Sequence, residues 1–352
     1  MCNPFKARGY FRRIVLSFLV MGLVALLHGE FRTLSARAQT PISRPIRLAS
    51  TPWTPFTNEP GKARFALEIV QAALQRAGYT VNTTIIEEGK LTSALLNKEY
   101  DGSAALWKDS EREKTLLYSK PYLENRLILV GRKGSDVSAT QLSALKGKRV
   151  ALVETYAYGD AISTSGGPTF VRSASEEDSV QKVLSNDAEY TLIDELVEEY
   201  ILKNYPDKAR NLLDFGSTPL IVRTLHFAVR KDLPNAATII DKFNSQLQGM
   251  ITDHTYNRLL QLNWIQADVD GDGKLEYVPI SDQAGTVPPN RSYKIITIPS
   301  TTTTVSTSSP GGFYVGGKLY QNWSTVPDQF KLAGPNDTVT GGTKFSIFNF
   351  NF

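Results

Sequence analysis

The chain has 352 residues, a formal net charge of +4 and a single cysteine, Cys2. Residues 1–38 hold six of the 39 Lys and Arg residues but one of the 35 Asp and Glu residues, so residues 39–352 carry 33 basic and 34 acidic groups. A nearly neutral segment without cysteine excludes disulfides and thiolate metal sites, and its charge gives no reason to expect nucleic-acid binding.

The N-terminal residues have the pattern of an export signal. Basic residues between positions 6 and 13 precede an apolar run, Ile14–Leu27, that is shorter than the roughly 20 residues of a membrane span. Ala36-Arg37-Ala38 fits a small-x-small cleavage site. We therefore expect residues 1–38 to be a signal peptide and the protein to be periplasmic or secreted after cleavage near Ala38. An uncleaved membrane anchor is the alternative.

Strand and helix patterns alternate from residue 46 to about residue 264. In chain order they predict strands at 46–49, 81–86, 127–130, 149–153, 190–193 and 225–229, and helices at 65–77, 91–96, 194–203 and 235–250, with a further helix capped by Ser175. The clearest helix places Ala66, Val70 and Ala73 on one face and has Gly78 where a left-handed cap is needed. Such alternation predicts an α/β fold with mainly parallel sheets and helices on both faces.

The C-terminal part has a different composition. An acidic, glycine-containing segment at 266–280 is followed at 281–352 by a Thr/Ser-rich run (301–309) and by short β-like pieces at 313–315, 318–320 and 344–352. We expect a linker or exposed loop and a small β-rich extension there.

Several short motifs between Arg44 and Gln266 occur in the order and spacing of one protein family. They are Trp53–Phe56, Tyr100–Gly102, Ser110–Arg112, Tyr118–Tyr122, Leu145–Val150 and Ile193–Glu195. On these motifs the sequence resembles the bacterial extracellular solute-binding proteins of family 3, the polar amino acid-binding group that serves ABC importers.

The resemblance implies a two-lobe, type II periplasmic-binding-protein fold with hinge strands, followed by the β-rich extension. The solute-binding domain would span 44–265, with lobe I at 44–130 and 225–265 and lobe II at 131–224. The protein would act as a monomer that captures a small charged solute of amino-acid type in the cleft between the lobes. Closure would be favoured because both lobes touch the ligand only when shut.

The resemblance also assigns roles in this cleft. Arg112 of lobe I matches the residue that holds the ligand's carboxylate, and Asp194 of lobe II matches the one that holds its ammonium group. Arginine suits the first role because its planar fork binds a carboxylate with two hydrogen bonds. Each residue has a plain alternative: an exposed ion pair with Asp109 or Glu111 for Arg112, and a helix N-cap for Asp194.

Further ligand contacts are expected from aromatic and hydroxyl side chains. Trp53 would form an apolar wall, whereas Phe56 would belong to the core, and Thr155 with the neighbouring Tyr156 would offer polar atoms from lobe II. The chain departs from the family pattern at Trp107 and at Ala105, where small hydroxyl residues are common, and Trp107 is expected to contact the ligand by adding bulk or stacking.

At the position where binders of basic amino acids are acidic, this chain has Ser50. A lysine-like or arginine-like ligand is therefore disfavoured, and an aromatic ligand, or one that is not an amino acid, stays open. Two other function classes also stay open. One is a sensory or interaction module, and the other is a dehydratase-like enzyme that would use Glu154 beside Arg112. No catalytic residue is assigned, and no cofactor is required.

The acidic segment has the spacing of a calcium-binding loop. Oxygen-bearing side chains occupy loop positions 1, 3, 5 and 9, glycine occupies position 6, and a main-chain carbonyl would come from position 7; the residues are Asp268, Asp270, Asp272, Lys274 and Glu276. The glutamate that an EF-hand has at position 12 is replaced by Pro279. The sequence therefore predicts a weak structural Ca²⁺ site, and a solvated acidic turn is the alternative.

Overall fold

The structure is a computed structural model that describes residues 44–162, 166–285, 293–295 and 312–331. The predicted signal peptide, the Thr/Ser-rich run and the strand expected at 344–352 lie outside the described residues. Within the described part of the chain, none of the helices is both long and apolar enough to cross a membrane.

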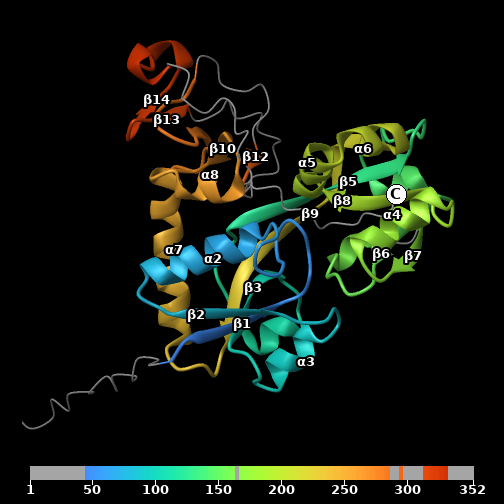
Figure 1. Cartoon of the computed structure of the whole chain (residues 1–352), viewed down its shortest axis with the longest axis horizontal. Coiled ribbons are helices and arrows are strands. Elements are labelled where there is room, and N and C mark those ends of the chain that lie inside the picture. Colours follow the sequence, from blue (N-terminus) through green and yellow to red (C-terminus); the bar gives the residue numbers. More distant parts are fainter. Residues whose placement is uncertain (1–43, 163–165, 286–292, 296–311, 332–352) are drawn as a thin grey trace, which may run out of the picture. The chain divides into compact units, whose positions relative to one another are not determined.

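One nine-stranded sheet runs through both lobes of the protein (Figure 1). Its strand order is β2 (Val81–Ile85), β1 (Ile46–Ser50), β3 (Gly102–Trp107), β9 (Leu213–Arg230), β5 (Leu123–Arg132), β8 (Tyr190–Asp194), β6 (Arg149–Val153) and β7 (Thr169–Ser173), and β4 (Leu116–Tyr118) pairs with β9 off this path. The outer pairs are parallel at both ends of the sheet, whereas β3, β4, β5, β8 and β9 pair with one another antiparallel. The predicted α/β class is confirmed, but the expectation of a mainly parallel sheet is wrong, because four strand pairs of this sheet are parallel and four are antiparallel.

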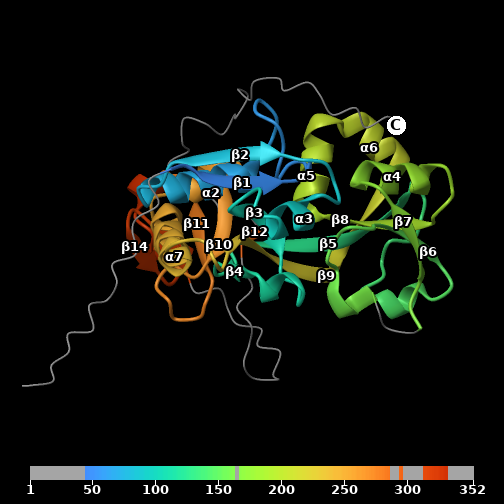
Figure 2. The ribbon, with the colours of Figure 1, turned by 90° about the horizontal axis from the view of Figure 1, so that it is seen from below.

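The two long strands β5 and β9 connect the lobes. They pair from Leu123 opposite Leu225 to Arg132 opposite Leu213. One end of β9 also pairs with β3 in lobe I, and β5 pairs along its second half with β8 in lobe II. This ribbon is the crossing between the lobes, as Figure 2 also shows.

Helices cover the sheet in both lobes. Lobe I contains α2 (Phe65–Arg76), α3 (Leu91–Leu96), α7 (Ala236–Thr252) and α8 (Thr255–Leu260), and lobe II contains α4 (Glu176–Leu184), α5 (Glu195–Asn204) and α6 (Pro206–Leu212). The predicted apolar face of α2 is buried, and Gly78 follows the helix with φ +86°, a conformation that favours glycine. Short 3₁₀ turns lie at Arg112–Lys114, Leu142–Leu145, Gly159–Ile162, Trp323–Thr325 and Asp328–Phe330.

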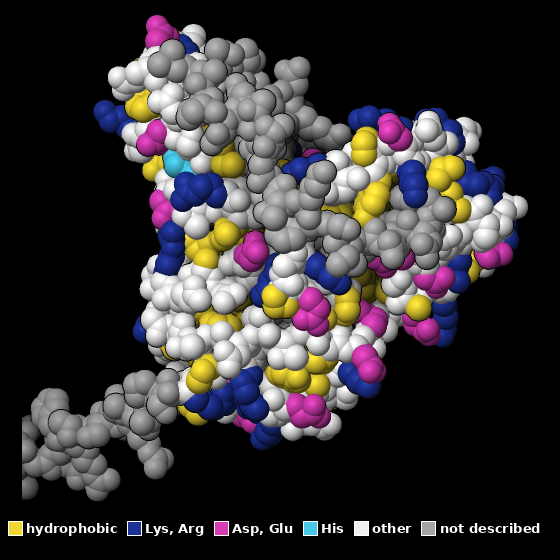
Figure 3. All heavy atoms as spheres, in the orientation of Figure 1, with side chains coloured by type: hydrophobic (Ala, Val, Ile, Leu, Met, Phe, Trp, Pro, Cys, Tyr) yellow, Lys and Arg dark blue, Asp and Glu magenta, His cyan; other side chains and the backbone are white. Residues whose placement is uncertain are grey.

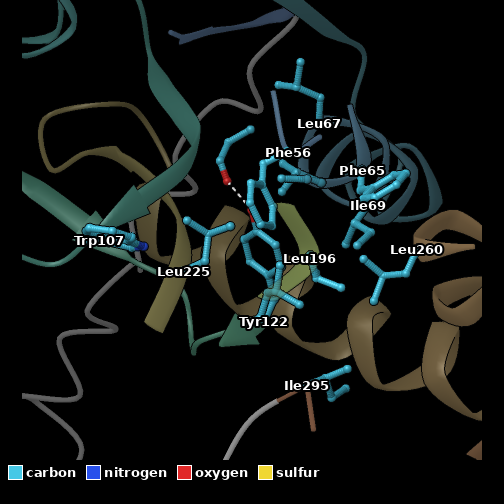
Figure 4. Packing of buried hydrophobic residues seen from close by; sticks show 14 of the residues in the cluster. Phe56, Phe65, Leu67, Ile69, Trp107, Tyr122, Leu196, Leu225, Leu260 and Ile295 are labelled. Carbon is cyan, nitrogen blue, oxygen red and sulfur yellow. Dashed lines mark hydrogen bonds between the residues drawn. The ribbon is translucent and has the colours of Figure 1, made fainter. Parts of the chain in front are cut away.

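A continuous apolar core lies beneath these helices. Phe56, Tyr122, Phe227 and Phe243 are fully buried in it, and Figure 4 shows part of this packing. Tyr122 is held on both sides, because its hydroxyl donates to the Ala104 carbonyl at 2.9 Å and its own carbonyl accepts from the buried hydroxyl of another tyrosine. The core therefore fixes the segment that precedes β5.

A second, five-stranded sheet is built from the C-terminal part. Its order is β12 (Tyr293–Lys294), β10 (Trp264–Ala267), β11 (Glu276–Pro279), β13 (Phe313–Val315) and β14 (Lys318–Tyr320). A small apolar cluster around Val315 and Val326 packs beneath it, and Trp264 and Trp323 meet there edge to face at 5.9 Å. The strands expected at 313–315 and 318–320 are present.

This second sheet contacts the ribbon between the lobes. The Tyr293 hydroxyl donates to the carbonyl of Glu124 in β5. Arg126, also in β5, donates through Nη1 to the Lys294 carbonyl at 2.9 Å, and its guanidinium carbon lies 4.1 Å from the centre of the Tyr293 ring. The C-terminal strands are therefore anchored on β5 where it passes from one lobe to the other.

Candidate functional site

A cavity of about 250 Å³ lies where residues of both lobes meet. Residues after β1 and β2 and residues on β3 form one wall, and residues that follow β6 form the other; the polar and aromatic members are Thr51, Trp53, Glu88, Trp107, Arg112, Thr155 and Tyr156. The carboxyl ends of parallel strands meet at one edge of a sheet, which is why loops so distant in sequence converge here.

Aromatic rings from both lobes form the apolar part of the cavity. Trp107 is 5% exposed, and its ring meets Trp53 edge to face with centroids 5.6 Å apart. On the lobe II side Tyr156 lies 5.5 Å from both indole rings. Edge-to-face pairs at these distances are attractive beyond the area that they bury. The structure therefore places Trp53, Trp107 and Tyr156, three of the predicted ligand contacts, together in the lining of one cavity.

Arg112 lines this cavity from the first residue of the 3₁₀ turn after β3. Its Nε lies 2.8 Å from Asp109 Oδ2, and the other oxygen of Asp109 accepts the backbone N–H groups of Glu111 and Arg112 at 2.8 and 3.0 Å. The side chain of Arg112 is 16% exposed. Arg112 thus forms the ion pair with Asp109 that the sequence offered as the alternative, and it also lines the cavity. The ion pair orients the guanidinium without removing Arg112 from the cavity wall.

Asp194 lies outside the residues that line the cavity. It is fully buried and caps α5, since Oδ1 accepts the Leu196 N–H at 2.7 Å, and Oδ2 accepts from Asn125 Nδ2 at 3.1 Å. Burial raises the pKa of this carboxyl from 3.8 to about 7, although both hydrogen bonds oppose the rise. The N-cap alternative is therefore present, and the predicted contact with a ligand's ammonium group stays a prediction.

A hydrogen-bond chain nevertheless links Asp194 to the cavity. Trp107 Nε1 donates to Asn125 Oδ1 at 2.7 Å, and the amide of Asn125 donates to Asp194. All three side chains are buried, so the carboxylate of Asp194 fixes the amide that fixes the indole. Asp194 therefore helps to position Trp107, a wall residue of the cavity, through Asn125, which lies between them.

Two glutamates were not among the residues predicted from the sequence: Glu88 lines the cavity, and Glu176 lies outside its lining but contacts Trp53. Glu88 lies three residues after β2 ends, and Glu88 Oε1 accepts the Thr155 hydroxyl of the opposite lobe at 2.7 Å. Glu176, the first residue of α4, is 8% exposed and accepts from Trp53 Nε1 at 3.0 Å. Burial raises the pKa of Glu176 well above its ordinary value. The position of Glu88 after a parallel strand was the signal that could have identified it.

Two residues for which the sequence suggested a role do not line the cavity. Glu154 is exposed and forms an ion pair with Arg172, and this acid, named for a dehydratase-like reaction, is not among the residues that line the cavity with Arg112. Ser50 is buried, and its hydroxyl has no hydrogen-bond partner among the described residues. Ala105, by contrast, does line the cavity together with Trp107, as the family spacing implied.

Comparison with known families decides what this two-lobe architecture is. The sequence profile of the bacterial extracellular solute-binding proteins, family 3, matches residues 47–267. The chain belongs to this family. Its members and structural neighbours are binding proteins.

Solved structures of similar fold include ArgBP, a periplasmic binding protein of an arginine transport system and the BvgS VFT2 domain. A mutant of ArgBP from T. maritima gives a TM-score of 0.51 at 23% identity and covers 62% of this chain and 93% of its own. An arginine transport-system periplasmic binding protein from Legionella pneumophila gives 0.53 at 20% identity, covering 62% and 99%. The BvgS VFT2 domain from Bordetella pertussis gives 0.51 at 19%, covering 61% and 91%. Comparison with curated proteins gives no match. These neighbours confirm the type II periplasmic-binding-protein fold.

The family match ends one residue before the acidic loop. Within this loop the structure brings the carboxylate oxygens of Asp268, Asp270 and Glu276 within 4.8 Å of one another. Asp272, in contrast, pairs with the Lys274 ammonium at 2.7 Å. The predicted set of five ligands thus includes three clustered side chains and one that is engaged by a neighbouring cation.

Proposed function

We propose that the cavity between the lobes binds a small solute that carries a carboxylate, an amino acid in the simplest case. In this proposal the protein works outside the cytoplasm and presents the solute to an ABC importer. The observation that carries the proposal is the position of Arg112, a permanently charged fork on the wall of a cavity that is otherwise largely aromatic.

The cavity also offers a negative charge for the solute's ammonium group. Glu88 lines the same cavity as Arg112, so a zwitterion would meet one fixed cation and one fixed anion. Thr155 holds the Glu88 carboxylate from the other lobe, which would couple that contact to closure. Charge-assisted hydrogen bonds of this kind contribute about 1.5–3 kcal/mol each.

Size and wall chemistry restrict the solute. A cavity of about 250 Å³ is slightly smaller than most ligand sites, which usually span about 300–1,000 Å³, so the solute must be small. The rings of Trp53, Trp107 and Tyr156 favour an apolar or aromatic side chain over a charged one.

The test is solute binding by the wild type and by Arg112→Gln. A thermal-shift screen against amino acids and small carboxylates identifies the solute, because a ligand at 100 times its Kd adds about 2.7 kcal/mol of stability. Calorimetry should then give a Kd about 10- to 150-fold weaker for Arg112→Gln, which loses one charge-assisted contact. Arg172→Gln is the matched control, since Arg172 is exposed and pairs with Glu154 away from the cavity. Unchanged affinity in Arg112→Gln would refute the assignment.

A second candidate function is a sensory or interaction module, and direct bonds between the lobes favour it. The Thr155 hydroxyl donates a hydrogen bond to Glu88 across the cleft, and Trp53 Nε1 donates one to Glu176. In such a module these bonds, rather than a transported solute, would set the angle between the lobes. Small-angle scattering of Thr155→Val without added solute would then give a larger radius of gyration than the wild type, and an unchanged radius counts against this candidate.

A further inference from the structure

The acidic loop connects two strands of the C-terminal sheet. It runs from Asp268 to the residue before Glu276, between β10 and β11, which pair antiparallel with Ala267 opposite Glu276. It begins directly after the segment that matches the solute-binding family. The loop therefore belongs to what this chain adds to the family fold.

Glu276 is the unusual residue of this loop, because its carboxylate is buried. The residue is fully buried, and one oxygen, Oε2, accepts the Val269 N–H at 3.0 Å. The other oxygen, Oε1, is buried and has no hydrogen-bond partner among the described residues. A buried carboxylate oxygen without a partner is costly, and such groups in native proteins are normally paired, hydrated or bound to a metal ion.

The neighbours of Glu276 increase this cost instead of relieving it. Ligand oxygens of Asp268, Asp270 and Glu276 lie within 4.8 Å of one another. Like charges this close repel in a partly buried site. Oxygens that lie 2.3–2.6 Å from a shared Ca²⁺ ion are at most about 5 Å apart, so the observed spacing suits one ion.

The backbone of the loop folds around the Asp268 carboxylate. Gly271 and Gly273 have φ angles of +81° and +86°, values that residues other than glycine rarely adopt. Both of their N–H groups donate to the Asp268 carboxylate, at 2.6 and 3.1 Å. The metal ligands that the cluster offers are carboxylate oxygens, with no histidine or cysteine among them, and such a set suits Ca²⁺ better than Zn²⁺.

We propose that the 268–276 loop binds one Ca²⁺ ion, with Glu276 as the buried ligand and Asp268 and Asp270 as the ligands at the surface. Asp272 is a fourth ligand only if its ion pair with Lys274 opens. The site is separate from the solute cavity, and the ion neutralises the buried carboxylate at the start of β11.

Bound calcium would stabilise the C-terminal sheet, because β11 carries the next strands. Tyr277, adjacent to Glu276, pairs with Phe313 of β13, and their rings stack with centroids 5.2 Å apart. The Tyr277 N–H also donates to the Gly312 carbonyl at 2.9 Å. A charge left uncompensated at Glu276 weakens the strand on which β13 and β14 are assembled.

The experiment is calcium titration of the purified chain after removal of metal with a chelator. We expect calorimetry to give one site with a Kd of about 10⁻⁴–10⁻³ M, and the Tm to rise with CaCl₂ but much less with equal MgCl₂. Glu276→Gln should abolish both effects, and in chelator its Tm should equal or exceed that of the wild type, because the unpaired charge is gone. Absence of heat and of a Tm shift up to about 10 mM CaCl₂ would overturn the proposal.

Two further variants keep the test decisive if Glu276→Gln does not fold. Asp270→Asn changes an exposed side chain of the cluster and should weaken calcium binding at least tenfold; an unchanged Kd overturns the proposal. Asp328→Asn is the control, since this acid of the C-terminal part is 97% exposed and lies outside the cluster. We expect it to bind calcium as the wild type does, and an equal loss of affinity would mean that calcium responds to surface charge and not to a site.

Discussion

Asp194 allows a sharp test of how burial acts on a titrating group at the edge of the site. The carboxyl is fully buried, and its pKa is raised from 3.8 to about 7, chiefly by burial. The hydrogen bonds from Leu196 and Asn125 favour the ionised form but do not outweigh the loss of hydration.

The sign of the effect follows from proton binding in the two states. Between about pH 4 and pH 7 the folded protein keeps the Asp194 proton, whereas the unfolded chain has lost it. The folded state therefore binds more protons, and the free energy of unfolding falls as the pH rises through this window. A shift from 3.8 to about 7 corresponds to about 4 kcal/mol of lost stability at pH 8 relative to pH 4.

Asp194→Asn should remove this term, because asparagine does not titrate and is also a good N-cap. Urea unfolding at several pH values between 4 and 8, followed by tryptophan fluorescence, gives the free energy of unfolding of both proteins. We expect the variant to gain about 4 kcal/mol on the wild type as the pH rises from 4 to 8. Asp207→Asn, an exposed acid in α6, is the matched control. A stability difference that does not change with pH would refute the reasoning.

Two further variants test the core around the ribbon. Gly102→Ala should lower the free energy of unfolding by about 1–3 kcal/mol in urea denaturation, because an added Cβ would lie 2.1 Å from the Ala228 carbonyl oxygen, and a variant as stable as the wild type would contradict this packing. His226 has its pKa lowered to about 4 by burial, so the unfolded chain binds its proton first and stability is lost as the pH falls from about 6.5 to 4. His226→Gln should therefore lose about 3 kcal/mol less than the wild type over that range, and an identical acid dependence would show that His226 is not the group responsible.

Local sequence signals predicted the regular elements well. The apolar face of α2 and the cap formed by Ser175, whose hydroxyl accepts the Asp178 N–H at 3.1 Å, depend on residues a few positions apart. The same signals were incomplete where the partner strand determines the structure. β9 extends from Leu213 through Gly216 and Pro219, residues that rarely favour a strand, because β5 pairs with it along this length.

The helix predicted at 194–203 ends as expected, since α5 ends at Asn204, but the helix that follows it was not predicted from the sequence. Pro206 is the first residue of α6, a position where the missing N–H costs nothing. The helix break and the new helix start at the same place.

The candidate site was predictable only in part. The aromatic residues and Arg112 lie at the ends of strands, where family spacing and fold topology agree. Asp194 also ends a strand, but its carboxylate accepts the Leu196 N–H at the start of α5, which is the N-cap role that the sequence offered as the alternative. Glu88, which lines the cavity, and Glu176, which contacts its wall residue Trp53, each hydrogen-bond a residue of the opposite lobe, and such contacts depend on how the lobes meet.

The anchoring of β12 on β5 has a mechanical consequence. In β12, the Tyr293 hydroxyl donates to the Glu124 carbonyl, and the Lys294 carbonyl accepts from Arg126. The next residue along β5, Leu127, pairs with Asp194 in lobe II. A rotation of one lobe against the other that twists this stretch of β5 would also strain its contacts with β12. A partner bound to the C-terminal strands would then sense whether the cleft is open or closed.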